Sequence, residues 1–464
     1  MGEQLSMLDT MFLELEQFDE AAHMHIGAAL VFDPLPGGGT PDIAELRGHV
    51  RDRISVLPRF SQCLSDTHAG PLRWLTWEPA EDLDVDAHVL RATLPAPGGE
   101  SELSEWLGDF WSHRLDRHRP LWEMTLVDGL EGGRWALATK THHCLVDGVG
   151  SVDIGNALLD DSPEAAAGRP RPRAGEKART REGGRLWLSP GAVLRGARAG
   201  AGAVLHPRES FDRALSAAEL IVREEVIGAP RTSLNGPMSG TRLFEVVRMD
   251  LAEVRAVKDE RGGTVNDVVL ALCAGGLRQL LLSRGDELPE AGLRAQVPVN
   301  IRSLDKEHAL GNELTSLFVE LPVAEPDPIA RYRRIVDRAA QLKSGSQRSG
   351  GKTIVDLADL GPPLFGAVLA RLMFGSTRMF NLTITNVPAS RQRLYAFGAP
   401  LVEILPLVPL FAGHTVGIAV VSYDDSMVFG LNADRMTAAD VGVLAEGIRR
   451  SFAELRPSAV SEPS

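Results

Sequence analysis

Apolar residues recur along the chain with two different periods, and each period predicts a different kind of element. Residues 24–33 (MHIGAALVFD) are mainly apolar and precede a Pro- and Gly-rich stretch, which indicates a strand followed by a turn. Residues 41–57 have a helical pattern, with Pro41 and Asp42 near its start. Residues 101–117 predict a helix with one apolar face packed in the core. Its apolar positions are Leu103, Trp106, Leu107, Phe110, Trp111 and Leu115.

Strands and helices are mixed in both halves of the chain. Residues 135–141 alternate as a strand, and residues 150–161 read as a helix. In the second half we predict a long helix from about Val265 and a last helix within residues 437–456, with Thr437 as its N-cap. Further strands are predicted at residues 295–303, 312–322, 380–388, 415–423 and 426–434. This mixture indicates an α/β or mixed α+β class.

The composition changes sharply after Pro163. From there to about Arg208 the chain is rich in Gly, Ala, Pro and Arg, and such a segment cannot bury enough apolar surface to fold by itself. We therefore predict an N-terminal domain at residues 1–162, a linker and crossover at 163–232, and a C-terminal domain at 233–464. The basic linker is interpreted as a solvated crossover, with contact to acidic phosphate groups as the alternative.

Two apolar stretches, at about residues 352–375 and 397–412, stand out from the rest. Acidic residues interrupt both, and no window of about 18 uncharged apolar residues predicts a spanning helix. The two stretches suit a path for an oily substrate or attachment to a membrane or lipid-body surface, and they suit the core equally well. The first residues are acidic and lack a continuous apolar run, so no secretory signal is expected and a cytoplasmic location is predicted.

The bulk composition narrows the function classes. The formal net charge of -13 argues against a nucleic-acid partner, because phosphates would repel the chain. Three cysteines at scattered positions are too few for a disulfide framework or a zinc knuckle, which suggests a reducing compartment.

Two adjacent histidines are the main candidate for chemistry. Residues 139–150 read TKTHHCLVDGVG, in a chain with only 12 histidines. Adjacent side chains of a strand point to opposite faces, so one of His142 and His143 should face a site while the other packs. Asp147 follows, and Gly148 permits a sharp turn. Three plainer interpretations are a buried pair without chemistry, a metal site that no ligand spacing supports, and a dinucleotide loop that lacks its third glycine.

The segment HHCLVDG resembles the HHxxxDG motif of the coenzyme-A-dependent acyltransferase superfamily. The rest of the chain is similar to one branch, the bacterial wax ester synthase/diacylglycerol acyltransferase family. Ala389 departs from the family, which more often has glycine there. The similar blocks are LSMLDTMFLELE at 5–16, MHIG at 24–27, RPLWE at 119–123, LNGPMSGTR at 234–242, VNDVVLA at 265–271, PVNIR at 298–302, GNE at 311–313, TNVP at 385–388 and SYDD at 422–425.

The resemblance implies a fold and a set of site residues. The fold would be α/β, with two chloramphenicol-acetyltransferase-like domains, mixed sheets and a tunnel between them. His143 would be the general base, and His142, the other histidine of the motif, is included among the predicted catalytic residues. Asp147, beside Gly148, would be structural and pair with Arg302.

Two further positions complete the predicted site. Trp122 in RPLWE is expected to pack beside the site and help to shape it. Asn266 lies in GGTVNDVV, where Thr264 and Asp267 predict a capped helix start. An amide donor in a first turn suits a developing oxyanion, and a simple capping or turn role is the alternative.

The function that the resemblance implies is esterification of diacylglycerol to triacylglycerol by an acyl-CoA-dependent O-acyltransferase. Esterification of long-chain alcohols to wax esters would be a further activity. Acyl-CoA would be a co-substrate, with no cofactor, no metal and no nucleic-acid partner, and a peripheral place on the inner membrane or lipid bodies stays open. The alternatives are a carrier-protein-dependent condensation or ester-forming transferase, a non-catalytic lipid-surface binding protein, and a metal-dependent hydrolase.

Overall fold

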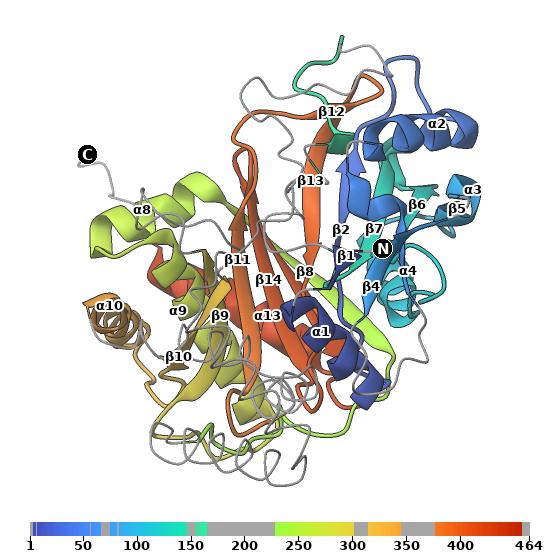
Figure 1. The fold of residues 1–464 in the computed structure, drawn as a ribbon. Coiled ribbons are helices and arrows are strands. Elements are labelled where there is room, and N and C mark those ends of the chain that lie inside the picture. The colour runs from blue at the N-terminus through green and yellow to red at the C-terminus, as the bar shows by residue number, and fades with distance from the viewer. Residues whose placement is uncertain are drawn as a thin grey trace, which may run out of the picture.

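Two six-stranded mixed sheets form the centre of the computed structural model, one in each half of the chain (Figure 1). The structure describes residues 3–5, 7–55, 57–65, 75–80, 83–145, 155, 157–164, 228–300, 314–344 and 376–456. The two sheets meet where strand β13 lies against β14 and β15. The predicted α/β class with mixed sheets is confirmed, and the tunnel between the halves stays a prediction.

The N-terminal sheet has the strand order β12-β13-β2-β7-β6-β5, antiparallel except for the parallel pair β5 and β6. A small sheet, β1-β4-β3, stands apart from it. The elements of this half are β1 (Glu3–Gln4), α1 (Met7–Phe18), β2 (His25–Phe32), α2 (Ile43–Ile54), η1 (Pro58–Ser61), β3 (Gln62–Leu64), β4 (Thr76–Pro79), α3 (Val85–His88), β5 (Val89–Thr93), α4 (Glu100–Ser112), β6 (Trp122–Asp128), η2 (Glu131–Gly133) and β7 (Trp135–His142).

Four predicted elements of this half, β2, α2, α4 and β7, are present. Strand β2 and helix α2 lie where the pattern placed them, and Asp42 caps α2 by accepting the amide hydrogen of Ala44. Helix α4 buries most of the predicted apolar face, but it ends at Ser112, so Leu115 lies beyond it, and Trp106 is only partly buried. Strand β7 differs from its alternating pattern, because all eight of its residues are buried. It is a central strand whose opposite faces, represented by Leu137 and Ala136, belong to two different core clusters.

The C-terminal sheet has the order β10-β9-β11-β14-β15-β8, and four helices within the described residues accompany it. Helix α9 is apolar enough to cross a bilayer, but its side chains lie in the core of this half, so it is a core helix. The elements are β8 (Arg242–Asp250), α8 (Leu251–Arg261), α9 (Val265–Ser283), β9 (Leu293–Asn300), β10 (Leu314–Leu321), α10 (Pro328–Ser344), β11 (Leu382–Pro388), β12 (Tyr395–Ala396), β13 (Ala399–Leu407), β14 (Val416–Tyr423), β15 (Ser426–Asp434) and α13 (Val441–Leu455).

Strand β13 crosses from the C-terminal half into the N-terminal sheet, where it pairs antiparallel with β2; Figure 1 shows the orange β13 beside the blue β2. The apolar stretch 397–412 is therefore core for most of its length, and Leu401, Leu405 and Leu410 are buried. The other apolar stretch, at about 352–375, lies outside the described residues.

Three sequence expectations need comment. Helix α13 begins at Val441 after Asp440, so the prediction of Thr437 as its N-cap is wrong. The Thr437 hydroxyl instead donates to Asp434, because the chain turns once more before the helix starts. Most of the predicted helix at 150–161 and of the linker at 163–232 lies outside the described residues, so the domain boundaries remain predictions.

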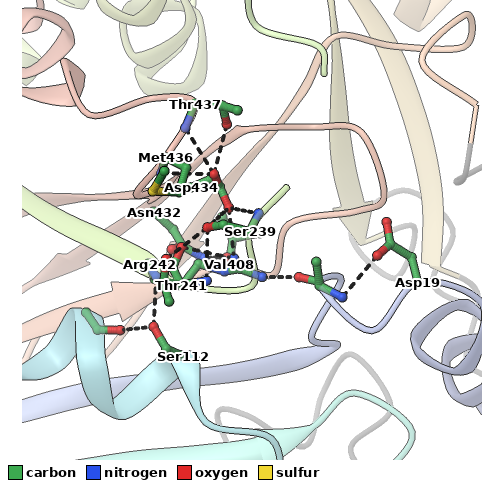
Figure 2. A network of polar contacts seen from close by, with 12 residues as sticks. Asp19, Ser112, Ser239, Thr241, Arg242, Val408, Asn432, Asp434, Met436 and Thr437 are labelled. Carbon is green, nitrogen blue, oxygen red and sulfur yellow. Dashed lines mark hydrogen bonds and ion pairs between the residues drawn. The ribbon is translucent and has the colours of Figure 1, made fainter. Parts of the chain in front are cut away.

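A polar network holds the two halves together beside α4 (Figure 2). Arg242, at the start of β8, donates its backbone hydrogen to Ser112 Oγ of α4 at 2.7 Å and its guanidinium to the carbonyl of Ala21. The same guanidinium lies 3.5 Å from the fully buried carboxylate of Asp434, which also accepts hydrogen bonds from Ser239. Buried ions are stable only when they are paired in this way, so the network fixes how the halves meet.

Candidate active site

Strand β7 carries the histidine pair to its end, where the chain turns. His142 is the last residue of β7 and lies opposite His25 of β2. The backbone hydrogen of His143 is donated to the carbonyl of Met24 at 2.8 Å, and that of Leu145 to the carbonyl of His142 at 2.9 Å. Both bonds fix the backbone of the turn, and the backbone determines the side from which each imidazole leaves the chain.

His143 is half-buried and stacked on Phe12 of helix α1, with ring centroids 3.9 Å apart and an interplanar angle of 20°. Its Nδ1 atom is buried and has no hydrogen-bond partner among the described residues. Burial lowers the pKa of His143 to about 4; its own backbone raises that pKa and His142 lowers it. The imidazole is therefore neutral near pH 7 and able to accept a proton.

His142 points into the protein instead, as the period of a strand predicts for its neighbour. Its side chain is 1% exposed. Nδ1 accepts the backbone hydrogen of Cys144 at 3.2 Å and lies 2.9 Å from the thiol sulfur of that residue. Nε2 lies 3.6 Å from a carboxylate oxygen of Glu16 on α1. His142 is thus a buried, oriented side chain beneath the turn that carries His143.

Asn266 lies in the first turn of α9, as predicted. Thr264 accepts the amide hydrogen of Asp267, and the Asp267 carboxylate accepts that of Thr264, so the expected capping box is present. The side-chain amide of Asn386, on β11, donates to Asn266 Oδ1 at 3.3 Å. Because this bond uses the oxygen of Asn266, its NH₂ group is directed elsewhere and can serve as a donor.

Trp122 begins β6 and is buried. Its indole N–H donates to the carbonyl of Phe60 at 2.8 Å, and its ring stacks on His88 with centroids 4.4 Å apart. It lies opposite Thr141 of β7, one residue before the histidine pair, so it packs against the strand that carries the two histidines.

Three predicted site residues, Asp147, Gly148 and Arg302, lie outside the described residues, and the proposed ion pair stays a prediction. Among the residues that are described, no group of three or more His, Cys, Asp and Glu side chains is placed to hold a metal ion.

Sequence reasoning missed Phe12, Glu16 and Asn386 as parts of the site. Phe12 and Glu16 lie four residues apart on α1, so they share one face of that helix. The signal that could have found Glu16 is a carboxylate within an apolar helical face, where it needs a partner. Asn386 carried no such signal, because an asparagine in a strand end is common in turns.

The architecture defines the class of protein first. The first condensation domain of the calcium-dependent antibiotic synthetase has the same fold, with a TM-score of 0.62, 16% sequence identity, and coverage of 100% of this chain and 99% of that chain. At this identity the likeness concerns the fold alone, which is an α/β fold with two mixed sheets.

The family follows from closer similarities. The wax ester synthase/diacylglycerol acyltransferase catalytic domain matches residues 5–269, and the WS/DGAT C-terminal domain matches residues 310–456. The chain belongs to this family and is an acyltransferase, as its motifs predict. A probable diacylglycerol O-acyltransferase of Mycobacterium tuberculosis is 32% identical over 454 residues, which are 97% of this chain and 95% of that protein. The wax ester synthase/diacylglycerol acyltransferase from Marinobacter aquaeolei VT8 has a TM-score of 0.72 and 28% identity, covering 97% of this chain and 98% of that chain.

Proposed function

We propose that this protein transfers the acyl group of acyl-CoA to the free hydroxyl of diacylglycerol, with His143 as the general base. The observation that carries this proposal is the state of the His143 ring: it is neutral, fixed by Phe12, and not engaged by a hydrogen bond from the described residues. Since Nδ1 is buried, Nε2 is the nitrogen left to meet a substrate.

The acid-base part of the reaction then needs one proton transfer to His143 and one proton transfer from it. His143 Nε2 takes the hydroxyl proton as the alcohol oxygen attacks the thioester carbonyl, and a C–O bond forms. When the tetrahedral intermediate collapses, the C–S bond breaks and the imidazolium returns the proton to the departing thiolate. General-base assistance of this kind contributes roughly 10²–10⁴-fold to the rate. No covalent acyl-enzyme and no cofactor are required, because the thiolate of coenzyme A is already a good leaving group.

Asn266 is the proposed donor to the oxyanion of that intermediate. It lies at the positive N-terminal end of α9, a helix of 19 residues, and its NH₂ group is left free by the bond from Asn386. A well-aimed donor in an oxyanion hole contributes about 3 kcal/mol to the stabilisation of the transition state. The capping functions at this helix start are carried by Thr264 and Asp267, which leaves the Asn266 side chain available for this role.

Long-chain alcohols are the proposed second acceptors. The family name and the Marinobacter relative combine wax ester and diacylglycerol activities. A primary alcohol and the free hydroxyl of diacylglycerol present the same nucleophile to the base, so the choice between them depends on the walls of the acceptor path. We further propose that the enzyme is cytoplasmic and works at the surface of the inner membrane or of lipid bodies, because diacylglycerol resides in such surfaces.

The test is incubation of the purified protein with radiolabelled palmitoyl-CoA and equal amounts of diacylglycerol and hexadecanol. We expect labelled triacylglycerol as the main product, a smaller amount of wax ester, and one free coenzyme A thiol per ester formed. Thiol release with only free palmitate as product would identify a hydrolase and refute the proposal. Ester formation from palmitoyl-carrier protein but not from palmitoyl-CoA would reassign the donor.

A further inference from the structure

A buried carboxylate lies directly beneath the histidine pair. Glu16 lies in the last turn of α1, and only 1% of its surface is exposed. One of its oxygens lies 3.6 Å from His142 Nε2, and the other lies 3.5 Å from His25 Nε2. Burial of an ionised carboxylate costs free energy unless neighbouring groups pair with it and donate hydrogen bonds to it.

Arg117 holds that carboxylate in place. Its guanidinium donates through Nε at 3.2 Å and Nη2 at 2.8 Å to the same Glu16 oxygen that faces His142. Nη2 also donates to the carbonyl of Leu13 in α1. Burial raises the pKa of the Glu16 carboxyl, but the adjacent His142 and His25 rings and the Arg117 guanidinium lower it below its ordinary value. Glu16 is therefore an ionised hydrogen-bond acceptor.

The hydrogen bonds of His142 fix which ring nitrogen carries the proton. Nδ1 accepts the backbone N–H of Cys144, so it has no hydrogen of its own in the neutral ring. Burial raises the pKa of the Cys144 thiol well above its ordinary value, so that thiol is also a donor toward Nδ1. The single proton of the neutral imidazole must then be on Nε2, where it faces Glu16.

We propose that Glu16 is a positioning residue for catalysis: it accepts the Nε2 proton of His142 and so keeps the Nδ1 lone pair of His142 available to the turn that carries His143. Without this acceptor, the neutral His142 ring loses its preference for the Nε2-protonated form. In the other tautomer, a hydrogen on Nδ1 would oppose both the N–H and the S–H of Cys144. The turn would loosen and the His143 ring would leave its place on Phe12.

Helix α1 therefore acts on both histidines, through Phe12 on His143 and through Glu16 on His142. The two contacts come from residues four positions apart on one face of the helix, so they move together. The catalytic part of this inference rests on the proposed role of His143, whereas the tautomer of His142 can be observed independently of any activity.

The first test is therefore spectroscopic. In full-length protein labelled with ¹⁵N-histidine, we expect His142 to show a protonated Nε2 and an unprotonated Nδ1, with its signals assigned by their loss in His142→Ala. The same signature should weaken or reverse in Glu16→Met, which has a similar shape but offers no acceptor. A protonated Nδ1 on His142 in the wild-type protein overturns the inference, even if no variant can be purified.

The second test separates positioning from mere stability. We expect Glu16→Met to lower kcat on the order of 10- to 100-fold, with KM for palmitoyl-CoA and for diacylglycerol within about twofold of wild type, as for a displaced catalytic group. Glu16→Gln retains an acceptor oxygen and should recover part of the rate. Glu14→Met is the matched control, because Glu14 lies on the same helix, is half-buried and is placed near Arg117 but not near His142.

The outcomes distinguish the two proposals. If wild-type protein forms no ester but shows the expected His142 tautomer and its loss in Glu16→Met, the proposed function fails and the role of Glu16 stands. If Glu16→Met lowers the melting temperature but leaves the tautomer and the kcat of the folded enzyme unchanged, Glu16 is only structural and the inference is wrong.

Discussion

Each half of the molecule contains a histidine stacked on a phenylalanine, and the two pairs look alike in most respects. His143 stacks on Phe12 with centroids 3.9 Å apart, and His414 stacks on Phe380 with centroids 4.1 Å apart. Burial, as the first cause, lowers the pKa of each to about 4. Stacking and a depressed pKa therefore do not distinguish the proposed base His143 from His414.

The difference lies in what the ring nitrogens meet. Both nitrogens of His414 lie within hydrogen-bond distance of a backbone carbonyl, Nδ1 at 2.9 Å from Ala412 and Nε2 at 3.0 Å from Phe380. Its side chain is almost fully buried. His143 is half-buried, and no hydrogen bond within the described part of the chain engages its ring. The two histidines thus differ in hydrogen bonding and exposure, and this difference is what supports His143, and not His414, as the proposed base.

The comparison is tested most strongly by removing each imidazole. We expect His143→Ala to lower kcat/KM by roughly 10²–10⁴-fold, because the general base is lost, with little change in the melting temperature. The matched variant His414→Ala should lower the melting temperature, since it leaves a buried carbonyl without its donor and opens a cavity, while the folded enzyme keeps kcat within about threefold. Equal losses of kcat in the two folded variants would erase the distinction between the two histidines.

The C-terminal half is expected to contribute to chemistry through a neutral amide. Asn266→Ala should lower kcat by about 10²–10³-fold and leave KM for acyl-CoA nearly unchanged, because an oxyanion donor acts mainly in the transition state. The measurement is a steady-state comparison of kcat and KM with palmitoyl-CoA. A rise in KM at constant kcat would show that Asn266 binds the substrate and does not stabilise the oxyanion.

In the pH dependence of stability the two histidines should behave alike. Each folded-state pKa, about 4, lies below the ordinary value of 6.5, so the unfolded chain binds protons first as the pH falls. The free energy of unfolding should therefore fall between pH 6.5 and 4, by up to about 1.4 kcal/mol per pH unit for each histidine. His143→Gln and His414→Gln should each reduce this slope in urea titrations at pH 7 and 5.5. A slope that neither variant changes would mean that the two imidazoles are not held neutral by the fold.

The smallest expected effect concerns Asn386. Its bond to Asn266 only orients the amide, so Asn386→Ala should lower kcat several-fold, and Asn266→Ala should mask this loss in the double variant. Kinetics of the two single variants and the double variant provide the measurement. Additive losses would show that the two asparagines act independently.

Much of the fold could be predicted from local pattern. Strand β2, helix α2 with its Asp42 cap, and helix α9 with its capping box were predictable, because each depends on residues close together in the chain. The prediction of Thr437 as an N-cap failed. Its hydroxyl donates to Asp434 in the turn before the helix, and the helix begins only at Val441. The role of β13 was not predictable, because strand pairing with β2 joins residues more than 350 positions apart.

The candidate site likewise has features that follow from local sequence and features that depend on contacts between distant elements. The sequence by itself determined that two adjacent histidines end a strand, that Asn266 begins a helix, and that the chain belongs to an acyltransferase family, because these follow from short-range order and shared motifs. Only the tertiary structure decided which histidine is buried on Glu16 and which keeps an unengaged ring on Phe12, and it paired Asn266 with Asn386. The physical reason is that pKa, tautomer and access are set by contacts between elements, and those contacts exist only once the chain has folded.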